Sequence, residues 1–452
     1  MITYSIIQKS QLEGAKRLDA EYYQPEYFID FTKGSWQPIG EILELCQYGL
    51  SLAMNDKKIG YPMFKMDNID SSFLFEDDVR FADVPESLVD QFMIKRDDVF
   101  FNRVNSEEFV GRTGIYKSDN LKSVFASYLV RARVKSDGEV LADYLNIFLN
   151  SSFGLKQIKK FARRAVNQAN VNAEELKQMR IAILPIVEQE KVTELSNESW
   201  KEFQNSKSLY SQAENLLLEE LGLKDFEAEE RLFSIANLSE VKKANRIDAE
   251  YFQQKYQKVL SIIHANGGVK LGELATIKKG VEPGSEAYQE EGKLFVRVSS
   301  ISKDGVTDKD QKYLKDDLYQ KLKKDYEPKI GEILLTKDAS PGMAFVVKEP
   351  IEGIISGGVL RVKLKEDIEP EYLALVINSI IGQSQVERDA GGSIIMHWKP
   401  DQVKELQVPI LGKPTQQKID ELVRKSHEAS KKAKELLGEA KRKVEEMIER
   451  KN

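Results

Sequence analysis

The chain has 452 residues, of which 41% are hydrophobic and 31% charged, so two to four folded domains are expected and a disordered chain is excluded. No apolar run approaches the roughly 20 residues of a membrane span, and the start MITYSIIQKS lacks the pattern of a secretory signal. A net charge of −6 argues mildly against nucleic acid unless cations gather locally, and the single cysteine, Cys46, excludes an internal disulfide and favours a cytoplasmic location.

The first part of the chain, residues 1–184, predicts a mixed domain. Short β-like runs (FKMDNI, DVFFN and YLVRARV) are separated by Gly, Asp and Ser turns. A helical pattern, ADYLNIFLNSSFGLKQIKKFARR, comes near its end. After Pro185 a long polar helix is expected over residues 185–224.

The second part repeats this plan. Residues 225–410 carry the runs LFVRVSSI, EILLT and GVLRVKL, followed by the helical pattern PEYLALVINSIIGQSQVER. A final polar helix is expected over residues 411–452. The segment RLDAEYYQPEY, from Arg17, returns as RIDAEYFQQKY, from Arg246, and six further matches keep the same order. The chain is therefore a tandem duplication of a unit of about 225 residues.

Both polar helices carry a narrow apolar seam. In the second helix the seam is predicted at Ile419, Leu422, Ser426, Ala429, Ala433, Leu436, Ala440 and Met447, broken by Lys443. In the first helix it is predicted at Val192, Leu195, Ser199, Glu202, Ser206, Leu209, Ala213 and Leu216, with Trp200 and Phe203 beside it. A repeat of 3.5 residues favours pairing of the two helices. The alternative is that each helix lies separately on its own domain.

Antiparallel pairing would relate the two mixed domains by an approximate two-fold axis. A helix of 35 residues is about 50 Å long, and dimeric DNA readers place two modules about 34–36 Å apart or more. The predicted fold class is α+β, with two tandem mixed domains of pseudo-two-fold symmetry separated by two long helices that form an antiparallel coiled coil.

No catalytic motif emerges from the sequence. The three histidines, His264, His397 and His427, are not paired with a Ser or Cys motif, and neither a zinc cluster nor a phosphate-binding loop is present. The repeated carboxylates, Asp19 with Glu21 and Asp248 with Glu250, have the form of an acid pair. The favoured interpretation is a carboxylate that binds Arg17 or Arg246 or caps a helix. We expect a non-catalytic chain without a cofactor.

A local excess of cations suggests DNA contact. Residues 144–173 contain no acidic residue and carry five Lys and Arg. The last of these, Arg164, is followed by an amide-rich loop over residues 166–170. Lys and Arg neutralise phosphates, and Asn, Gln and Arg read base edges. The alternative is a solvated helix face and an ordinary polar loop. Trp398, in the matching region of the second copy, is equally interpreted as a core anchor.

Two further exposed loops in each copy complete the set of candidate DNA contacts. The predicted DNA-binding residues are Tyr48, Arg103, Asn105, Arg112, Lys160, Arg163, Arg164, Asn167, Gln168 and Asn170 in the first copy, and Lys278, Lys279, Lys337, Ser340, Ser393, His397, Trp398 and Lys399 in the second.

The duplicated plan resembles the DNA-specificity (S) subunit of type I restriction-modification enzymes. The resemblance lies in EILLTKDASPG, in GGSIIMHWKPDQVKELQVPI and in the helix start QQKIDEL, echoed by ANVNAEELKQMRIAILPIVEQEKV. It implies two target-recognition domains, each reading half of a split site in double-stranded DNA. It also implies two methyltransferase (M) subunits and restriction (R) subunits as partners, and no membrane. The first copy lacks the Gly-Gly-Ser of the second. The alternatives are a duplicated adapter that binds proteins, or an enzyme with a site outside known motifs.

Overall fold

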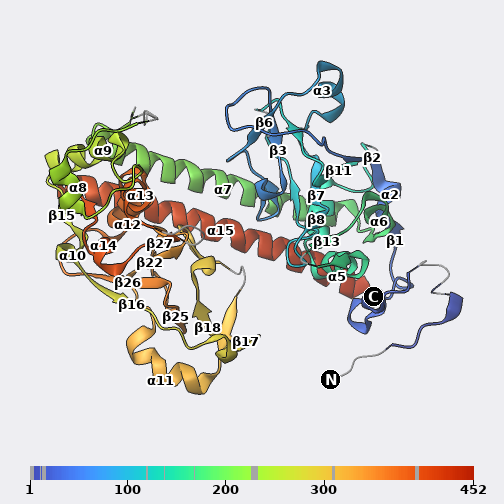
Figure 1. Cartoon of the computed structure of the whole chain (residues 1–452). Helices are drawn as coiled ribbons and strands as arrows, with labels where there is room; N and C mark the ends of the chain where they lie inside the picture. Colours follow the sequence, from blue (N-terminus) through green and yellow to red (C-terminus); the bar gives the residue numbers. More distant parts are fainter. Residues whose placement is uncertain are drawn as a thin grey trace. The chain divides into compact units, whose positions relative to one another are not determined.

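A computed structural model gives the fold of the chain (Figure 1). It describes residues 5–10, 12, 17–118, 121–136, 138–166, 168–224, 226, 233–307, 311–391 and 396–451. The chain forms two units, Met1–Gln204 with Lys431–Asn452, and Asn205–Ser430. Both units mix helices with sheets, which confirms the predicted α+β class. No helix in the described part of the chain has the length and apolar character needed to cross a membrane.

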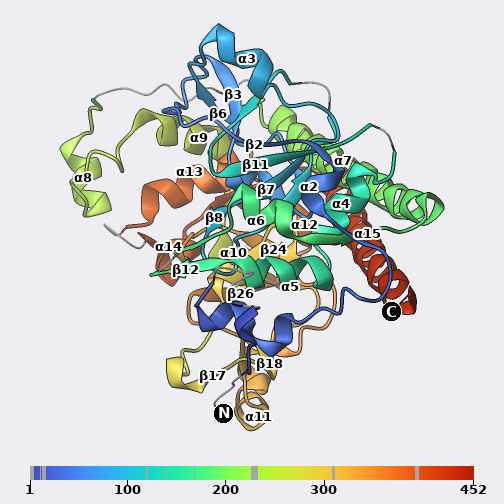
Figure 2. The same ribbon diagram turned by 90° about the vertical axis from the view of Figure 1, so that its right-hand side faces the viewer.

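The first unit is built around a sheet of order β2-β11-β7-β9-β5-β4, whose strands β2, β11 and β7 lie side by side in both views (Figure 1, Figure 2). Smaller sheets have the orders β10-β3-β6, β12-β13-β8 and β1-β14. The strands are β1 (Trp36–Pro38), β2 (Leu43–Tyr48), β3 (Tyr61–Phe64), β4 (Ile69–Asp70), β5 (Phe73–Leu74), β6 (Arg80–Ala82), β7 (Val99–Asn102), β8 (Val104–Asn105), β9 (Thr113–Ile115), β10 (Val124–Phe125), β11 (Leu129–Val134), β12 (Arg163–Ala165), β13 (Gln168–Asn170) and β14 (Arg180–Ala182). The helices are α2 (Ile39–Ile42), α3 (Glu86–Phe92), α4 (Ala142–Leu149), α5 (Ser152–Phe161), α6 (Ala173–Gln178) and the start of α7 (Ile186–Glu220).

The second unit repeats this plan with sheets of order β16-β26-β22-β24 and β17-β21-β18-β25 and the pairs β15-β28, β19-β20 and β23-β27. Its strands are β15 (Val269–Lys270), β16 (Ala275–Lys279), β17 (Tyr288–Gln289), β18 (Lys293–Val296), β19 (Ile301–Ser302), β20 (Gly305–Val306), β21 (Lys312–Leu314), β22 (Ile333–Thr336), β23 (Asp338–Ala339), β24 (Ala344–Val346), β25 (Gly353–Ile355), β26 (Val359–Leu364), β27 (Met396–His397) and β28 (Gln407–Val408). Its helices are α8 (Leu238–Ala244), α9 (Gln254–Ala265), α10 (Leu271–Leu274), α11 (Asp316–Tyr326), α12 (Pro370–Asn378), α13 (Ile380–Asp389), α14 (Pro400–Lys404) and the start of α15 (Lys413–Lys451).

One predicted strand in each copy ends early. FKMDNI and LFVRVSSI each break after the first strand into a turn of 3₁₀ helix. The side chain of Asn68 accepts a hydrogen bond from the backbone N–H of Lys65 at 2.9 Å, and Ser300 accepts one from Arg297 at 2.9 Å. These local bonds compete with the strand, which is why the apolar pattern alone was misleading.

The single helix predicted near the end of each copy is a pair of helices, α4 with α5 and α12 with α13. Ser151 and Ser379 lie at the junctions and cap the second helix of each pair. A Cβ atom on Gly154 would lie 2.3 Å from the carbonyl oxygen of Phe148. In the second copy, a Cβ atom on Gly382 would lie 2.2 Å from the carbonyl oxygen of Ile377. The two helices of each pair therefore pack closely only because glycine stands there.

The helices α7 and α15 pair within each unit, as predicted. In the first unit the Ser199 hydroxyl donates to the carbonyl oxygen of Ala433 at 2.8 Å. In the second unit the Ser426 hydroxyl donates to the carbonyl oxygen of Ser206, also at 2.8 Å. The small side chains on the seam allow these backbone contacts. The alternative of two separate helices is thereby wrong.

The predicted seam is correct at some positions and wrong by one residue at others. The buried seam of α15 is Ile419, Val423, Ser426, Ala429, Ser430, Ala433, Leu437, Ala440, Val444 and Ile448, so the predicted Leu422, Leu436 and Met447 lie beside it. The buried seam of α7 includes Val192, Ser196, Ser199, Phe203, Ser206, Ala213 and Leu217, so Leu195, Glu202 and Leu216 lie beside it. A repeat of 3.5 residues alternates steps of 3 and 4, and neighbouring apolar residues hide which step comes first. The seam is not broken at Lys443, because the neighbouring Val444 is the buried residue at that place.

In the first unit, aromatic side chains join the end of strand β5 to helix α7. The Phe73 ring centroid lies 5.1 Å from that of Trp200 and 5.9 Å from that of Phe203, and Phe75 contacts both rings as well. Offset and edge-on aromatic pairs each add about 0.5–1.5 kcal/mol beyond burial. The sheet of the first unit and helix α7 therefore share one continuous hydrophobic core.

Candidate nucleic-acid interface

Three stretches that are far apart in the sequence meet in the first unit. Strand β13 pairs with β12 on one side and with β8 on the other, so the predicted basic loop lies against the strand that carries Asn105. The guanidinium carbon of Arg103 lies 5.1 Å from the centre of the Tyr48 ring. The Tyr48 hydroxyl in turn accepts a hydrogen bond from the backbone N–H of Ala173 at 2.9 Å. The structure therefore gathers all three predicted loops into one surface.

The arginines of this surface are held by carboxylates. Arg163 donates through Nε to Glu175 at 2.7 Å, and Arg164 donates through Nε to Glu107 at 2.6 Å. The sequence predicted both arginines at the end of a helix, but they lie on strand β12, because α5 ends at Phe161. The ion pairs reduce the positive charge that this strand offers to phosphates.

The lysines of α5 differ from these arginines. Lys156 and Lys159 are exposed, and within the described residues they have no carboxylate partner. Lys160 instead lies with its ammonium nitrogen 4.8 Å from the centre of the Tyr22 ring, and burial lowers its pKa. Lys156 and Lys159 are therefore the cations of α5 that are free to contact phosphate.

The hairpin β12–β13 carries the polar side chains predicted to read bases. Gln168 is exposed next to the hairpin turn, and Val166 in that turn is 93% exposed. Asn170 is half-buried on β13. Asn167 lies outside the described residues. An exposed two-stranded ribbon of this kind has the shape that enters a major groove.

Two predicted contacts of the first unit are engaged within the protein. The side-chain oxygen of Asn105 accepts from the backbone N–H of Ser106 at 2.8 Å, and its amide nitrogen lies 3.6 Å from the sulfur of Met66. Arg112 is half-buried with its guanidinium carbon 3.9 Å from the centre of the Phe109 ring, and burial lowers its pKa. Both side chains are less available to DNA than Gln168.

The second unit builds the corresponding surface from strands β23 and β27. Asp338 pairs with His397 across this ladder and lies 2.8 Å from its Nδ1. Lys337 is buried and forms an ion pair with the same carboxylate. Burial acts to raise the pKa of Asp338, but the hydrogen bonds from Lys337 and His397 outweigh it and hold that pKa below its ordinary value. His397 itself is 58% exposed, so it remains open to a ligand while Lys337 does not.

Trp398 is a core residue, and its prediction as a DNA contact is wrong. Its side chain is 1% exposed and belongs to the hydrophobic core of the second unit. Its backbone N–H donates to the carbonyl oxygen of Lys337 at 2.7 Å, and Val171 makes the matching bond to Arg103 in the first unit at 2.9 Å. Trp398 therefore fills the framework position that Val171 fills in the first unit.

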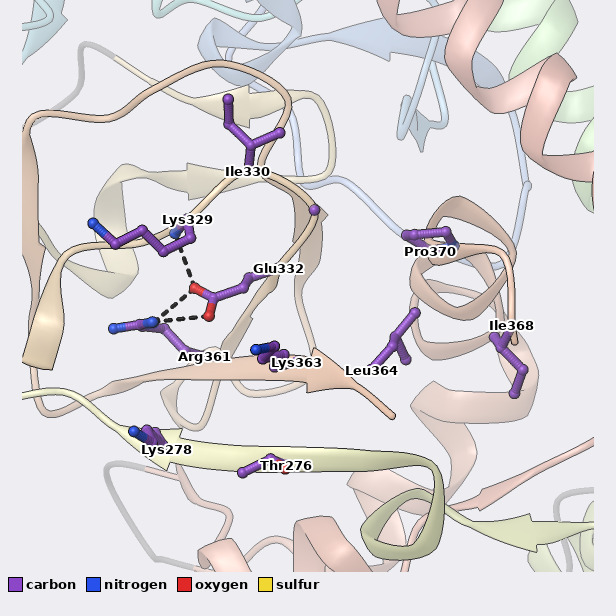
Figure 3. A pocket seen from close by; sticks show the side chains of 11 residues that line it. Thr276, Lys278, Lys329, Ile330, Glu332, Arg361, Lys363, Leu364, Ile368 and Pro370 are labelled. Atoms are coloured by element: carbon purple, nitrogen blue, oxygen red, sulfur yellow. Dashed lines mark hydrogen bonds and ion pairs between the residues drawn. The ribbon is translucent and has the colours of Figure 1, made fainter. Parts of the chain in front are cut away.

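The other predicted residues of the second unit lie at its surface. Lys278, Lys279, Ser340 and Lys399 are exposed, and Ser393 lies outside the described residues. Lys278 lines an open groove of about 750 Å³ together with Lys363, Lys329 and Arg361 (Figure 3).

One carboxylate lies among the cations of this groove. Arg361 donates to both oxygens of Glu332 at 2.8 Å, and the backbone N–H of Lys329 donates to one of them at 2.9 Å (Figure 3). Burial acts to raise the pKa of Glu332, but these bonds outweigh it and lower that pKa. Lys278 and Lys363 are exposed, so the groove keeps a net positive charge.

Sequence reasoning missed the carboxylates that organise these cations. Glu175 forms a capping box with Asn172 at the start of α6, and its side chain also receives Arg163. The spacing of Asn172 and Glu175 is visible in the sequence as a helix-start signal. The pairing of Glu107 with Arg164 has no such signal, because the two residues meet only through the fold.

The described residues contain no group of three or more His, Cys, Asp or Glu side chains that could hold a metal ion. Burial raises the pKa of the Cys46 thiol to about 11. Because the thiolate is the nucleophilic form, this cysteine is unreactive near pH 7.

The second copy matches a known protein family. Residues 267–434 match the family model described as type I restriction modification DNA specificity domain. The chain is 27% identical over 183 residues to a protein of Methanocaldococcus jannaschii named as the MjaX type I restriction enzyme specificity subunit. It is 24% identical over 172 residues to the type I restriction enzyme EcoKI specificity subunit of Escherichia coli.

These matches cover 39% and 38% of this chain, and 43% and 36% of the two relatives, so the chain spans less than half of the length of either. Among solved structures, the chain is similar to the S subunit of a type I restriction-modification system from M. genitalium, with 13% identity and a TM-score of 0.40. That alignment covers 94% of this chain and 97% of the other. The resemblance noted in the sequence is confirmed by the family model and by the two relatives.

Proposed function

Residues 267–434 belong to the family of type I restriction-modification DNA specificity domains, and on this premise we propose that the whole chain is a DNA-recognition subunit that reads a split target. The observation that carries the proposal is that loop stretches far apart in the sequence meet in each unit, three in the first unit and two in the second. Both units use the same framework bonds there, yet they present different side chains. Two related surfaces of this kind would read two different half-sites with an unread spacer between them.

In the first unit, the hairpin β12–β13 is the proposed reading element. Gln168 and Asn170 supply amides, which pair with adenine, and the exposed Val166 supplies an apolar contact for a thymine methyl group. Lys156 and Lys159 would hold the phosphate backbone beside the hairpin. In the second unit His397, Lys279 and Lys399 take the corresponding roles.

We propose that the chain is non-catalytic and recruits two M subunits, which methylate the target, and R subunits, which cut DNA. Two units built on the same plan would offer similar surfaces to two identical partners. Arg163, Arg164 and Lys337 are tied to carboxylates, so these three candidate contacts offer less positive charge to phosphates. Charges on the partners would then supply much of the DNA affinity.

The test is a gel-shift and fluorescence-anisotropy measurement on the chain assembled with its M subunit. A pool of random duplexes is selected by binding, and the recovered sequences are read. The expected result is a motif of two fixed blocks separated by a spacer of constant length. Recovery of no common sequence would contradict the proposal.

A further inference from the structure

The duplicated segment that begins at Arg17 and at Arg246 has an inward side that fixes it to its own unit. Arg17 makes a two-pronged ion pair with Asp19 and donates to the carbonyl oxygen of Phe161 at 3.1 Å. Arg246 pairs with Asp248 in the same way and donates to the carbonyl oxygens at the end of α13 at 3.2 Å. Each arginine thus binds the carboxyl end of one helix, where a cation is favoured.

The rings that follow are also placed alike. Tyr22 and Tyr23 meet edge-on with centroids 4.9 Å apart and an interplanar angle of 76°. Tyr251 and Phe252 meet with centroids 5.0 Å apart at 77°. The inward side is therefore one structure built twice, and packing within each unit explains why its residues recur.

The outward side of the same segment recurs as well, and contacts within the chain do not explain it. Leu18 is 89% exposed and its counterpart Ile247 is 91% exposed. Twelve residues earlier in each copy, Ile6 is 90% exposed and Ile235 is 85% exposed. Duplicated copies that have diverged widely elsewhere thus keep large aliphatic side chains at the same two solvent-facing positions.

A carboxylate accompanies each exposed aliphatic residue. Glu21 and Glu250 are exposed, and neither side chain has a hydrogen bond or ion pair with the described residues. An exposed polar side chain without contacts can be replaced with little effect on the fold, and an exposed aliphatic side chain lowers solubility. Both are retained here in both copies, which indicates a contact with a molecule outside the chain.

We propose that these two outward faces, Leu18 with Glu21 and Ile247 with Glu250, are docking sites for two copies of one protein partner. The partner would carry an apolar pocket for the aliphatic side chain and a basic residue for the carboxylate. A second copy of this chain fits less well, because two equal sites on every chain would build open-ended assemblies. Two copies of a different protein, with one complementary site each, give a closed complex.

This inference rests on the proposed function in one respect, because the proposed function identifies the partner as the M subunit. The test mixes the full chain with that subunit and measures stoichiometry by light scattering and mass photometry. The chain variants are Leu18→Asp, Ile247→Asp and the double variant. Ile59→Asp is the control, because Ile59 is also exposed but the matching position of the second copy, Glu291, is not aliphatic.

We expect wild type and the Ile59→Asp variant to bind two partners, each single variant one, and the double variant none. Loss of a buried aliphatic contact should weaken the affected site by at least about 10-fold. Unchanged stoichiometry and affinity in the double variant would overturn the docking sites and leave the proposed function intact. The reverse outcome combines two results. Each single variant binds one partner fewer than wild type, and the wild-type complex selects no DNA sequence. That outcome would support the docking sites and refute the proposed function.

Two further outcomes also decide the question. Self-association of the isolated chain that Leu18→Asp abolishes would assign the face to a second copy of the chain and overturn the proposal. Unchanged circular dichroism of all variants is expected, because none of the altered side chains is buried. A variant that unfolds is replaced by Leu18→Ser or Ile247→Ser, for which the same stoichiometries are expected.

Discussion

Replacement of Lys156 and Lys159 by alanine should change how DNA binding depends on salt. Both lysines are exposed on α5 and have no carboxylate partner among the described residues. Each phosphate contact contributes about −0.9 to the slope of log K against log salt, so loss of two contacts should make the slope about 1.8 less steep. Over a fourfold rise in salt, wild type should then lose about 12-fold more affinity than the variant.

The assay is fluorescence anisotropy of the assembled complex on its selected duplex, at 50 to 200 mM salt. The matched control is Lys321→Ala with Lys324→Ala, which removes two exposed lysines from α11 in the other unit. The selected sequence should stay the same, since phosphate contacts position the protein without reading bases. A slope change below about 0.5, or an equal change in the control, would refute the assignment of α5 to the DNA backbone.

Three other predictions follow from the described contacts. Gln168→Ala should relax sequence preference at one position of one half-site by about 1–3 kcal/mol, as measured by competition with single-base variants of the duplex. Trp398→Ala should lower the free energy of unfolding by about 3–5 kcal/mol in a denaturant titration, whereas His397→Ala, next to it but exposed, should cost less than about 1 kcal/mol. Glu332 has a lowered pKa, so its stabilising effect is present above its ordinary value of 4.5 and is lost as pH falls through the lower folded value. Denaturation of Glu332→Gln and wild type from pH 7 to 3 should therefore show a stability difference that shrinks at the acid end.

The duplication and the two long helices were predictable because they depend on patterns along the sequence. A repeated segment and a run of apolar residues every 3.5 positions survive without knowledge of the fold. The phase of the seam was not predictable, since Leu436 and Leu437 are both apolar and only packing shows that Leu437 is buried. The structure alone therefore decides between neighbouring apolar residues.

The sequence shows which residue types could contact DNA, but it does not show which of those side chains are exposed and unpaired. The loops around Tyr48, Arg103 and Gln168 were chosen from the sequence because each carries side chains suited to DNA contact. Their convergence came from strand pairing and from the contact of Arg103 with Tyr48. Burial of Trp398 and the contact of His397 with Asp338 depend on residues that are distant in the sequence. Composition cannot separate a cation held by a carboxylate from one that is free.

The measurement that tests the account most directly is the target sequence of a chimaera. Residues 1–184 are replaced by the first domain of another specificity subunit, and the assembled complex is used to select duplexes from a random pool. The account predicts that one half of the selected motif changes while the other half stays as in wild type. A change in both halves, or in neither, would contradict the claim that each unit reads its own half-site.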